Sequence, residues 1–363
     1  MNFPSDISDV ESRIHAIDPV KYSATRNYKD GAVTHLSPYI SRGVISTRQL
    51  YLHIKSLGLP WYKTEKLIQE LAWRDYWQQV WIEKKDAIKV DLKNKQSHVT
   101  NYKIPKAIVN ANTGIKEIDY AIKNLYETGY MHNHMRMYVA SICCNIANSH
   151  WLEPAKWMYS NLLDGDLASN HLSWQWVAGS FSNKKYFANQ NNINKYFNSF
   201  QKNTFLDLDY EAFENITTPT ILQENTSFDV STKLPLVENP ILDKNKTSLI
   251  YNFYNIDPNW YKNKDMQRIF LMEPSFFIDN PVSKNVMNFI MKLTRNIKEI
   301  KIFIGEFSSL EKYVNTNNLY YKEHPTNNHY KGNQEDREWI SSIKGYYPSF
   351  FGYWKKIKKE MTQ

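Results

Sequence analysis

The sequence has little cysteine and no long apolar run. Its only two cysteines, Cys143 and Cys144, are adjacent. Neighbouring cysteines exclude a disulfide framework and any zinc or iron–sulfur cluster built from several thiolates, so a reducing cytoplasm is the expected location. No stretch approaches the length of a membrane span, and the first residues, MNFPSDISDVESRI, lack the features of a signal peptide. We therefore predict a soluble protein with no membrane partner.

Aromatic residues and positive charge are abundant. Aromatic residues make up 15% of the chain, with 11 Trp and 25 Tyr, and the formal net charge is +8. Flat side chains in this number suit stacked bases or a large ring cofactor, although an aromatic-rich core is the simpler alternative. The excess of positive charge favours a polyanionic partner such as nucleic acid.

The first two thirds of the chain have helical periodicity. Apolar residues recur at three- and four-residue spacing, and few alternating β-branched runs interrupt them. This pattern predicts helices over 44–55, 63–84, 115–127, 131–150 and 154–163. An all-helical domain over residues 1–216 is the expectation.

The pattern changes beyond residue 216. Residues 217–247 contain three prolines among polar residues and show no period, which indicates a linker or a wrapping segment. Residues 268–272 and 300–304 are typical of buried strands and flank a helical stretch over 282–297. The predicted fold class is therefore mainly α, with a small α/β domain over 248–363 after the helical domain.

The segment KLIQELAWRDYW places polar and aromatic side chains on one helix face. Glu70, Trp73, Arg74 and Trp77 stand at i, i+3, i+4 and i+7. Taken alone, the segment is explained more simply by a surface ion pair between Glu70 and Arg74, worth a few tenths of a kcal/mol.

The segment TGYMHNHMRMYVAS places Asn133, Arg136 and Met137 at i, i+3 and i+4. His132 and His134 in the same segment suggest zinc. At i, i+2 on a helix they point to different sides, and no acidic or thiol third ligand lies close by. We expect no metal.

The segment DGDLASNHLSWQW holds Asp164, Asp166 and Asn170, followed by Trp174 and Trp176. Buried carboxylates need partners, so this set is not simple core filling. A calcium loop of the D-x-D type is the alternative, but the glycine and terminal glutamate at EF-hand spacing are missing and the two tryptophans would be unexplained.

With YSATRNYKDGAVTHLSPYISRGVIS near the start, these segments resemble the FAD-binding domain of DNA photolyases and cryptochromes. The resemblance runs from about Tyr22 to Phe197 in the family's order and approximate spacing. Members of that family normally begin with an antenna domain, whereas here the similarity starts almost at Met1. The resemblance therefore implies a short photolyase-like protein without the N-terminal antenna domain.

The resemblance implies FAD as the cofactor. The turn after Val33 would hold the FAD diphosphate, Arg74 would lie beside the flavin, Arg136 would pair with Asp164, and Asn170 would face flavin N5. Val33 itself replaces a hydroxyl residue that the family often has. The implied cofactor-binding set is Tyr22, Thr34, His35, Leu36, Ser37, Glu70, Arg74, Asn133, Arg136, Asp164, Asp166 and Asn170.

The same resemblance implies a pocket for a flipped pyrimidine dimer. Its residues would be Glu70, Trp73, Asn133, Met137 and Trp176. Photolyases of the (6-4) type carry histidines at the positions of Asn133 and Met137, so cyclobutane dimers are the expected lesion. Ala188 stands where a basic DNA-binding residue is usual, which favours single-stranded DNA, because flipping then costs less.

The implied reaction is light-driven repair of cyclobutane dimers by electron transfer from excited FADH⁻, the activity of a deoxyribodipyrimidine photo-lyase, a carbon–carbon lyase. The expected catalytic residues are Glu70, Trp151, Asn170 and Trp174. Trp174 and Trp151 match the proximal and middle members of the family's tryptophan chain, whereas the distal position falls near Ile108.

Tyr102, Trp157 or Tyr159 would be substitutes for the distal tryptophan, although packing is the simpler interpretation of all three. The alternative function is a cryptochrome-like blue-light sensor that binds FAD without repair, and a weaker one is a non-catalytic nucleic-acid-binding protein. A monomer is expected.

Overall fold

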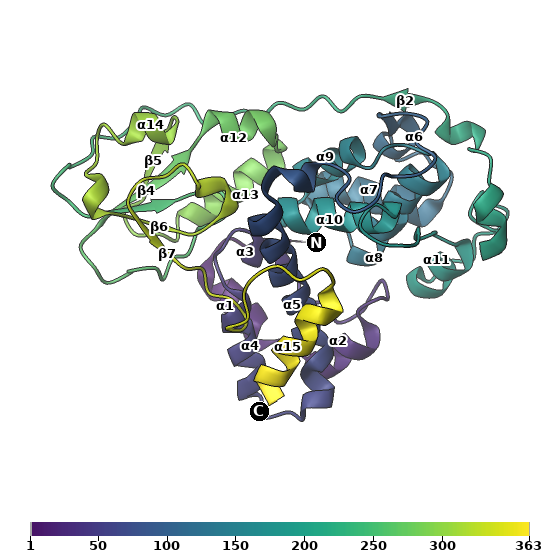
Figure 1. Cartoon of the computed structure of the whole chain (residues 1–363), viewed down its shortest axis with the longest axis horizontal. Helices are drawn as coiled ribbons and strands as arrows, with labels where there is room; N and C mark the ends of the chain where they lie inside the picture. Colours follow the sequence, from purple (N-terminus) through teal and green to yellow (C-terminus); the bar gives the residue numbers. More distant parts are fainter. Residues whose placement is uncertain (1, 363) are drawn as a thin grey trace. The chain divides into compact units, whose positions relative to one another are not determined.

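The computed structural model describes residues 2–362 and divides into two compact units (Figure 1). Of these residues, the first unit comprises 2–19, 34–83 and 230–362, and the second comprises 20–33 and 84–229. Both are assembled from separate segments, and the division into domains over 1–216, 217–247 and 248–363 stays a prediction. Within the described residues, no helix combines the length and the hydropathy needed to cross a membrane.

The second unit is helical. Its one strand pair is β1 (Ile104–Pro105) with β2 (Asn225–Thr226), two residues each. A continuous apolar core that includes Ile108, Trp151 and Trp174 holds the helices together. The helices are α2 (Pro19–Thr25), α6 (Lys106–Val109), α7 (Lys116–Thr128), α8 (Asn133–Ser141), α9 (Leu152–Asn161), α10 (Leu167–Ala178) and α11 (Gln190–Phe197).

The helix predicted over 131–150 is too long. The α-helix ends at Ser141, and Ile142–Ile146 form a π-helical turn, in which the Ala147 N–H donates to the Ile142 carbonyl at 2.9 Å. All five residues of this turn are buried. The core surrounds the π turn on every side, so most of its residues are apolar. The apolar pattern therefore continues past the end of the α-helix.

The first unit contains helices near the start of the chain and one at its end. They are α1 (Ile7–His15), α3 (Ser37–Ser41), α4 (Thr47–Ser56), α5 (Trp61–Lys84) and α15 (Phe350–Thr362). Helix α4 begins with a capping box, in which Ser46 Oγ accepts from Gln49 N and Gln49 Oε1 accepts from Ser46 N, both at 3.0 Å. This local signal fixes where α4 starts.

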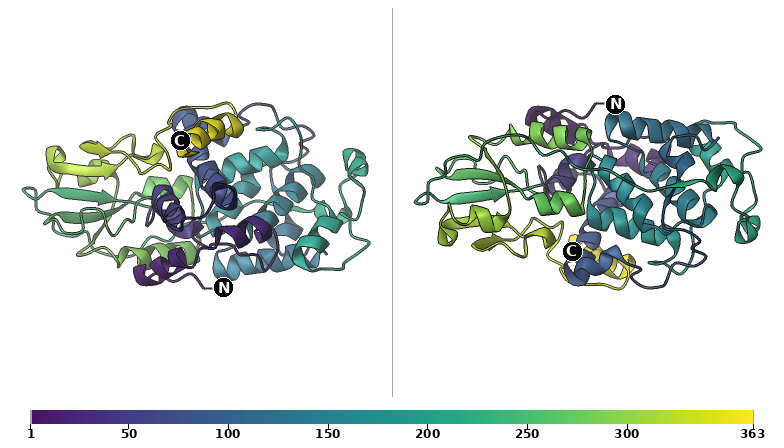
Figure 2. Two further views of the ribbon diagram at one scale, coloured as in Figure 1. Left: turned by 90° about the horizontal axis from the view of Figure 1, so that it is seen from below. Right: turned by 90° about the horizontal axis from the view of Figure 1, so that it is seen from above.

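A parallel five-stranded sheet forms the rest of the first unit. The strand order is β5 (Lys301–Ile304), β4 (Gln267–Met272), β3 (Ser248–Tyr251), β6 (Leu319–Lys322) and β7 (Asn333–Glu335). Every residue of β4 is buried, as expected for a strand covered on both faces. Helices α12 (Pro274–Asp279), α13 (Lys284–Thr294) and α14 (Phe307–Leu310) connect the strands (Figure 2).

The predicted mainly α fold with a small α/β part is confirmed. The sheet is larger than the single predicted β-α-β unit. It also contains β3, β6 and β7, which were not predicted. The segment LYYK of β6 alternates in burial over only four residues, and NQE of β7 is polar. These strands form by backbone pairing with their neighbours. Such pairing leaves no periodic pattern in so short a sequence.

Residues 336–362, called the C-terminal strap below, bind along α5. The Arg337 guanidinium donates to Gln78 Oε1, the Ile340 N–H to Asp75 Oδ2 at 2.7 Å, and the Gly345 N–H to Gln79. Asp75 is 4% exposed and also accepts from the Thr47 hydroxyl at 3.0 Å. Burial raises the pKa of Asp75 to about 6.

Deprotonation of Asp75 is expected to lower the free energy of unfolding. The folded pKa lies above the usual value of 3.8. The folded state therefore holds this proton more tightly, and the group's contribution to stability falls as pH rises from about 4 to about 6. Over that window the free energy of unfolding of the wild type, minus that of Asp75→Asn, should fall by roughly 3 kcal/mol. Urea titrations at each pH measure it, and a flat difference would contradict the prediction.

Candidate functional site

An ion pair links α8 to the chain after α9 in the second unit. Arg136 Nη2 lies 2.9 Å from Asp164 Oδ2, and Arg136 Nε donates to the Met131 carbonyl at 2.8 Å. The Asp164 side chain is 6% exposed. Tyr130 lies against the guanidinium, and burial raises the pKa of its hydroxyl to about 12. The ion pair expected from the sequence is therefore present, and the Met131 carbonyl and the Tyr130 ring hold its guanidinium in place.

Helix α10 begins with a carboxylate and positions an amide one turn later. Asp166 is the N-cap, and its Oδ1 accepts from the Ser169 N–H at 2.7 Å. Asn170 Nδ2 donates to the Ala155 carbonyl of α9 at 2.9 Å, which fixes the amide and leaves Oδ1 as an acceptor. Between them, the Ser169 hydroxyl oxygen is buried without a hydrogen-bond partner.

The predicted lesion-contacting residues of the second unit are accessible. Asn133, the first residue of α8, is exposed, and Met137 is half-buried one turn later. Trp176 on α10 is 37% exposed, with its ring 6.0 Å from that of Tyr186. Tyr22, which was predicted to bind the cofactor, lies half-buried on α2. An exposed amide and an indole are groups that hydrogen-bond and stack on bases.

Trp174 and Trp151 are buried in the core of the second unit, and Trp151 Nε1 donates to Asp91 Oδ1 at 2.8 Å. The His150 ring lies 5.6 Å from Trp151 and 5.2 Å from Tyr102, which is 68% exposed. A line of rings therefore connects Trp151 to the surface at Tyr102. Ile108, at the family's distal position, is fully buried.

Two other candidates for the distal position are buried. Trp157 and Tyr159 are each 2% exposed. Trp157 Nε1 donates to the Tyr126 hydroxyl at 2.9 Å, and Tyr159 meets the buried His171 ring. Of the three aromatic residues considered from the sequence, only Tyr102 combines contact with the ring line and solvent access.

The remaining predicted residues belong to the first unit. Thr34, His35 and Leu36 form the turn before α3, and Ser37 is the first residue of that helix. His35 has a left-handed backbone (φ 52°), and burial lowers the pKa of its imidazole. Arg74 Nη2 donates to Ser41 Oγ at 2.9 Å and so ties α5 to α3. The guanidinium is therefore fixed to the helix that follows the turn.

Glu70 and Trp73 on α5 both have partners from the chain. Glu70 pairs with Lys66 at 2.8 Å, with both side chains about a third exposed, so the pair contributes little to stability. The Trp73 ring is stacked on Phe350 of α15, with centroids 3.6 Å apart and planes at 10°. One face of the indole predicted to contact a lesion is therefore covered by the C-terminal strap.

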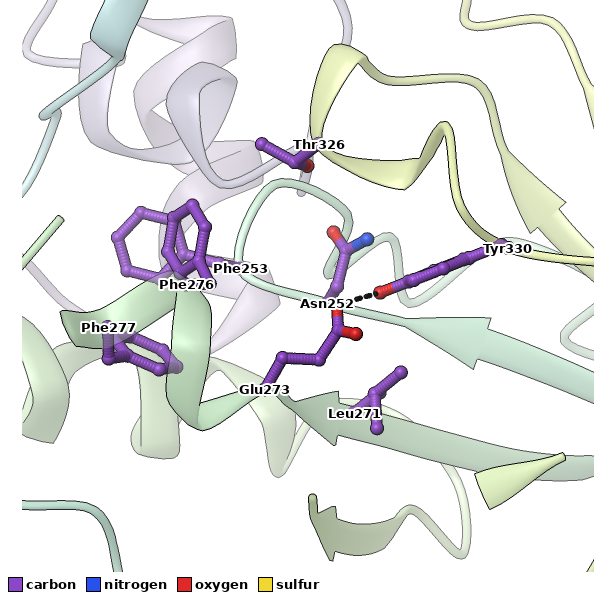
Figure 3. Close-up of a pocket in the computed structure, with 8 residues that line it drawn as sticks. All are labelled: Asn252, Phe253, Leu271, Glu273, Phe276, Phe277, Thr326 and Tyr330. Carbon is purple, nitrogen blue, oxygen red and sulfur yellow. Dashed lines mark hydrogen bonds between the residues drawn. The ribbon is translucent and has the colours of Figure 1, made fainter. Parts of the chain in front are cut away.

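A small hollow lies at the carboxyl ends of β3, β4 and β6 (Figure 3). Glu273 at its base accepts from the Tyr330 hydroxyl at 3.0 Å, from the Phe307 N–H at 3.0 Å and from His329 Nε2 at 2.7 Å. Asn252 and Thr326 are likewise bonded to the chain itself. The polar side chains of this hollow are thus committed to the fold.

Comparison with known proteins adds to this geometry. Residues 67–211 match the family model described as the FAD binding domain of DNA photolyase. The deoxyribodipyrimidine photo-lyase of Streptomyces griseus is 32% identical over 162 residues, which are 42% of this chain and 35% of that protein. Cryptochrome DASH of Danio rerio is 32% identical over 171 residues, which are 44% of this chain and 32% of that protein.

This region belongs to the photolyase/cryptochrome family. Its cofactor is FAD. The chain spans about a third of the length of the curated relatives it matches. Among solved structures, the cryptochrome of Synechocystis sp. PCC6803 aligns over 54% of this chain and 44% of that protein, with 26% identity and a TM-score of 0.49.

The second unit, which contains most of the matched region, fits a flavin nucleotide. A guanidinium, two carboxylates and an oriented amide supply both donors and acceptors, as a ring with polar edges requires. The partnerless Ser169 hydroxyl is the kind of buried polar atom that a ligand satisfies. The individual role of each residue stays a prediction.

Sequence reasoning missed three residues that shape the candidate site. Asp91 holds Trp151, Ser169 offers a hydroxyl beside Asn170, and Phe350 covers Trp73. Asp91 and Phe350 lie 60 and 277 positions from their partners, so no local pattern reveals them. Ser169 had a usable signal, since it lies inside the DGDLASN segment.

Proposed function

We propose that this chain is a light-driven DNA photolyase that acts on cyclobutane pyrimidine dimers. The observation that carries the proposal is helix α10. It presents the oriented amide of Asn170 and, six residues later, the half-exposed indole of Trp176, within the region that matches the photolyase domain. One helix thus supplies both a group suited to a flavin edge and a group suited to a base.

When bound, reduced FAD supplies an electron under blue light, and the residues of the chain supply position and environment. Asn170 Oδ1 accepts a hydrogen bond without adding negative charge. The Arg136–Asp164 pair keeps a fixed polar surface next to α10. Trp176 recovers part of the stacking that a flipped dimer loses.

Single-stranded DNA is the proposed preferred form. Ala188 is fully buried and its N–H donates to the Ser141 hydroxyl, so its side chain offers nothing to a phosphate. Lys184 is exposed nearby, whereas Lys185 is half-buried and donates to the Ser97 carbonyl. Fewer duplex contacts weaken duplex binding more than binding of an already unpaired strand.

A blue-light sensor is the second candidate. The relatives include proteins named cryptochrome DASH at the same level of identity as the photolyases. The stacking of Phe350 on Trp73 also favours it, since a sensor needs no open lesion pocket.

Irradiation of the reduced protein with dimer-containing oligo(dT) decides between these functions. The absorbance of restored thymine is followed in light and in darkness, for single-stranded and double-stranded substrates. Recovery that requires light, and is faster on the single strand, supports the proposal. A protein that binds flavin yet restores no thymine overturns the repair proposal and favours the sensor, and a colourless protein refutes both functions.

Electron supply to the flavin is expected to follow the line of rings ending at Tyr102. Trp151→Phe should slow photoreduction at least tenfold, because it removes the buried member, and Tyr102→Phe should slow it less, because it affects only the exposed end. Loss of the oxidised-flavin absorbance band under light with an external thiol gives the rate. Trp157→Phe is the matched control, and an equal effect there would contradict the assignment of Tyr102.

A further inference from the structure

Helix α15 has an apolar inner face and a basic outer face. The inner face consists of Phe350, Tyr353, Trp354 and Ile357, each at most 6% exposed. It packs on α5, where Trp354 stacks with Trp61 at 6.3 Å. The outer face consists of Phe351, Lys355, Lys356 and Lys359, all exposed.

The charged residues of α15 fall into two groups. Lys358 is held by Glu65 of α5. Glu360, the only acidic residue of the helix, accepts from the Ser342 N–H at 3.0 Å and from its hydroxyl at 2.7 Å. Lys355, Lys356 and Lys359 make no ion pair with any residue in 2–362. Three lysines therefore face solvent without an ion-pair partner, although the Glu360 carboxylate lies one turn beyond Lys356.

We propose that the outer face of α15 is a DNA-contacting surface, where Lys355, Lys356 and Lys359 contact phosphates and Phe351 stacks on a base. The proposal rests on the proposed function, since DNA is the substrate. Phe351 is 68% exposed, and its ring meets Trp73 edge-on with centroids 6.4 Å apart. The surface thus begins beside a residue assigned to lesion binding.

The helical spacing places the residues of this surface in a row along the axis of α15. Phe351, Lys355 and Lys359 stand at i, i+4 and i+8 and form a row about 12 Å long, with Lys356 beside it. An aromatic ring followed by a row of cations is the arrangement that binds a single strand without reading its sequence. The strand would run from Trp73 along the helix.

The packing of α15 argues against a membrane as the partner. A basic amphipathic helix that binds lipid inserts its apolar face among the acyl chains. Here that face is already buried against α5, with Phe350 stacked on Trp73 and Trp354 on Trp61. The exposed part offers charge and one ring, which match a phosphodiester strand better than a lipid surface.

The test is the salt dependence of binding to fluorescein-labelled oligo(dT), measured by fluorescence anisotropy on the full chain. The variant is Lys355→Gln/Lys356→Gln/Lys359→Gln. The control, Lys262→Gln/Lys264→Gln/Lys312→Gln, removes the same charge from exposed positions elsewhere in the first unit. The variant should reduce the slope of log K against log salt by about 2, since each single-strand phosphate contact contributes about 0.7.

Phe351→Ala should lower the affinity roughly fivefold or more at every salt concentration, with an unchanged slope. If the wild type binds DNA and the triple lysine variant has the same salt slope, α15 is not a DNA-contacting surface. The proposed function would then be unaffected. A wild type that binds no DNA refutes the proposed function and this surface together. The triple lysine variant is also tested on anionic phosphatidylserine vesicles. If it loses vesicle binding but keeps DNA binding, the outer face of α15 is a membrane surface and the proposal is overturned.

Discussion

Trp176→Ala is expected to abolish repair while leaving flavin binding intact. The indole is 37% exposed on α10, and its removal should affect the core little. Stacking of one base on an aromatic ring contributes about 1–3 kcal/mol, so affinity for a dimer-containing strand should fall roughly 5- to 150-fold. Repair should fall further, because the dimer is no longer held in place. Glu70→Ala is also expected to lose repair, through a lost hydrogen bond to the lesion and not through lost stacking.

Phe200→Ala is the matched control for Trp176→Ala. Phe200 is 92% exposed in the same unit and has no proposed role. Thymine restoration per absorbed photon and the flavin-to-protein absorbance ratio are measured together. If Trp176→Ala repairs dimers as the wild type does, the assignment of this indole to the lesion pocket is wrong.

Arg136→Met is expected to cost about 3 kcal/mol of folding free energy and to release the flavin. The substitution leaves the buried Asp164 carboxylate without its guanidinium partner and also removes the hydrogen bond to the Met131 carbonyl. Removal of one partner of a buried pair is costly because the remaining charge stays desolvated. Urea unfolding and the flavin absorbance of the purified protein report the two effects.

A second substitution separates stability from cofactor binding in this pair. Arg136→Met combined with Asp164→Asn buries no charge, so most of the folding free energy should return. Flavin binding should not return, because the guanidinium is still missing. Recovery of both properties would show that the pair has a structural role alone.

The helices and the polar residues along them were predictable. Asp166 and Asn170 stand four residues apart, and the regular turn of α10 places them on one side whatever surrounds the helix. The Arg136–Asp164 pair was also expected, although only from a family resemblance, since 28 residues separate its members. Helix boundaries were less accurate where the core continued past the regular helix, as at Ile142–Ile146.

The environment of Trp73 was not predictable. The helical pattern of KLIQELAWRDYW places the indole on a face with Glu70 and Arg74, yet Phe350 and Phe351 reach it from the end of the chain. The pairing of β6 with β3 was hidden for the same reason, since the paired residues stand 71 positions apart in the sequence. Such contacts depend on how distant segments pack.

The sequence by itself determined the helical periodicity and the spacing of the segments that resemble the photolyase/cryptochrome FAD-binding domain. Both are local properties, because rise and rotation per residue fix which side chains share a helix face. The tertiary structure alone decided that the C-terminal strap covers Trp73, that Tyr102 approaches Trp151 through His150, and that four short strands join β4 in one sheet. Those outcomes depend on the burial of apolar surface between residues far apart in the chain, which no local pattern specifies.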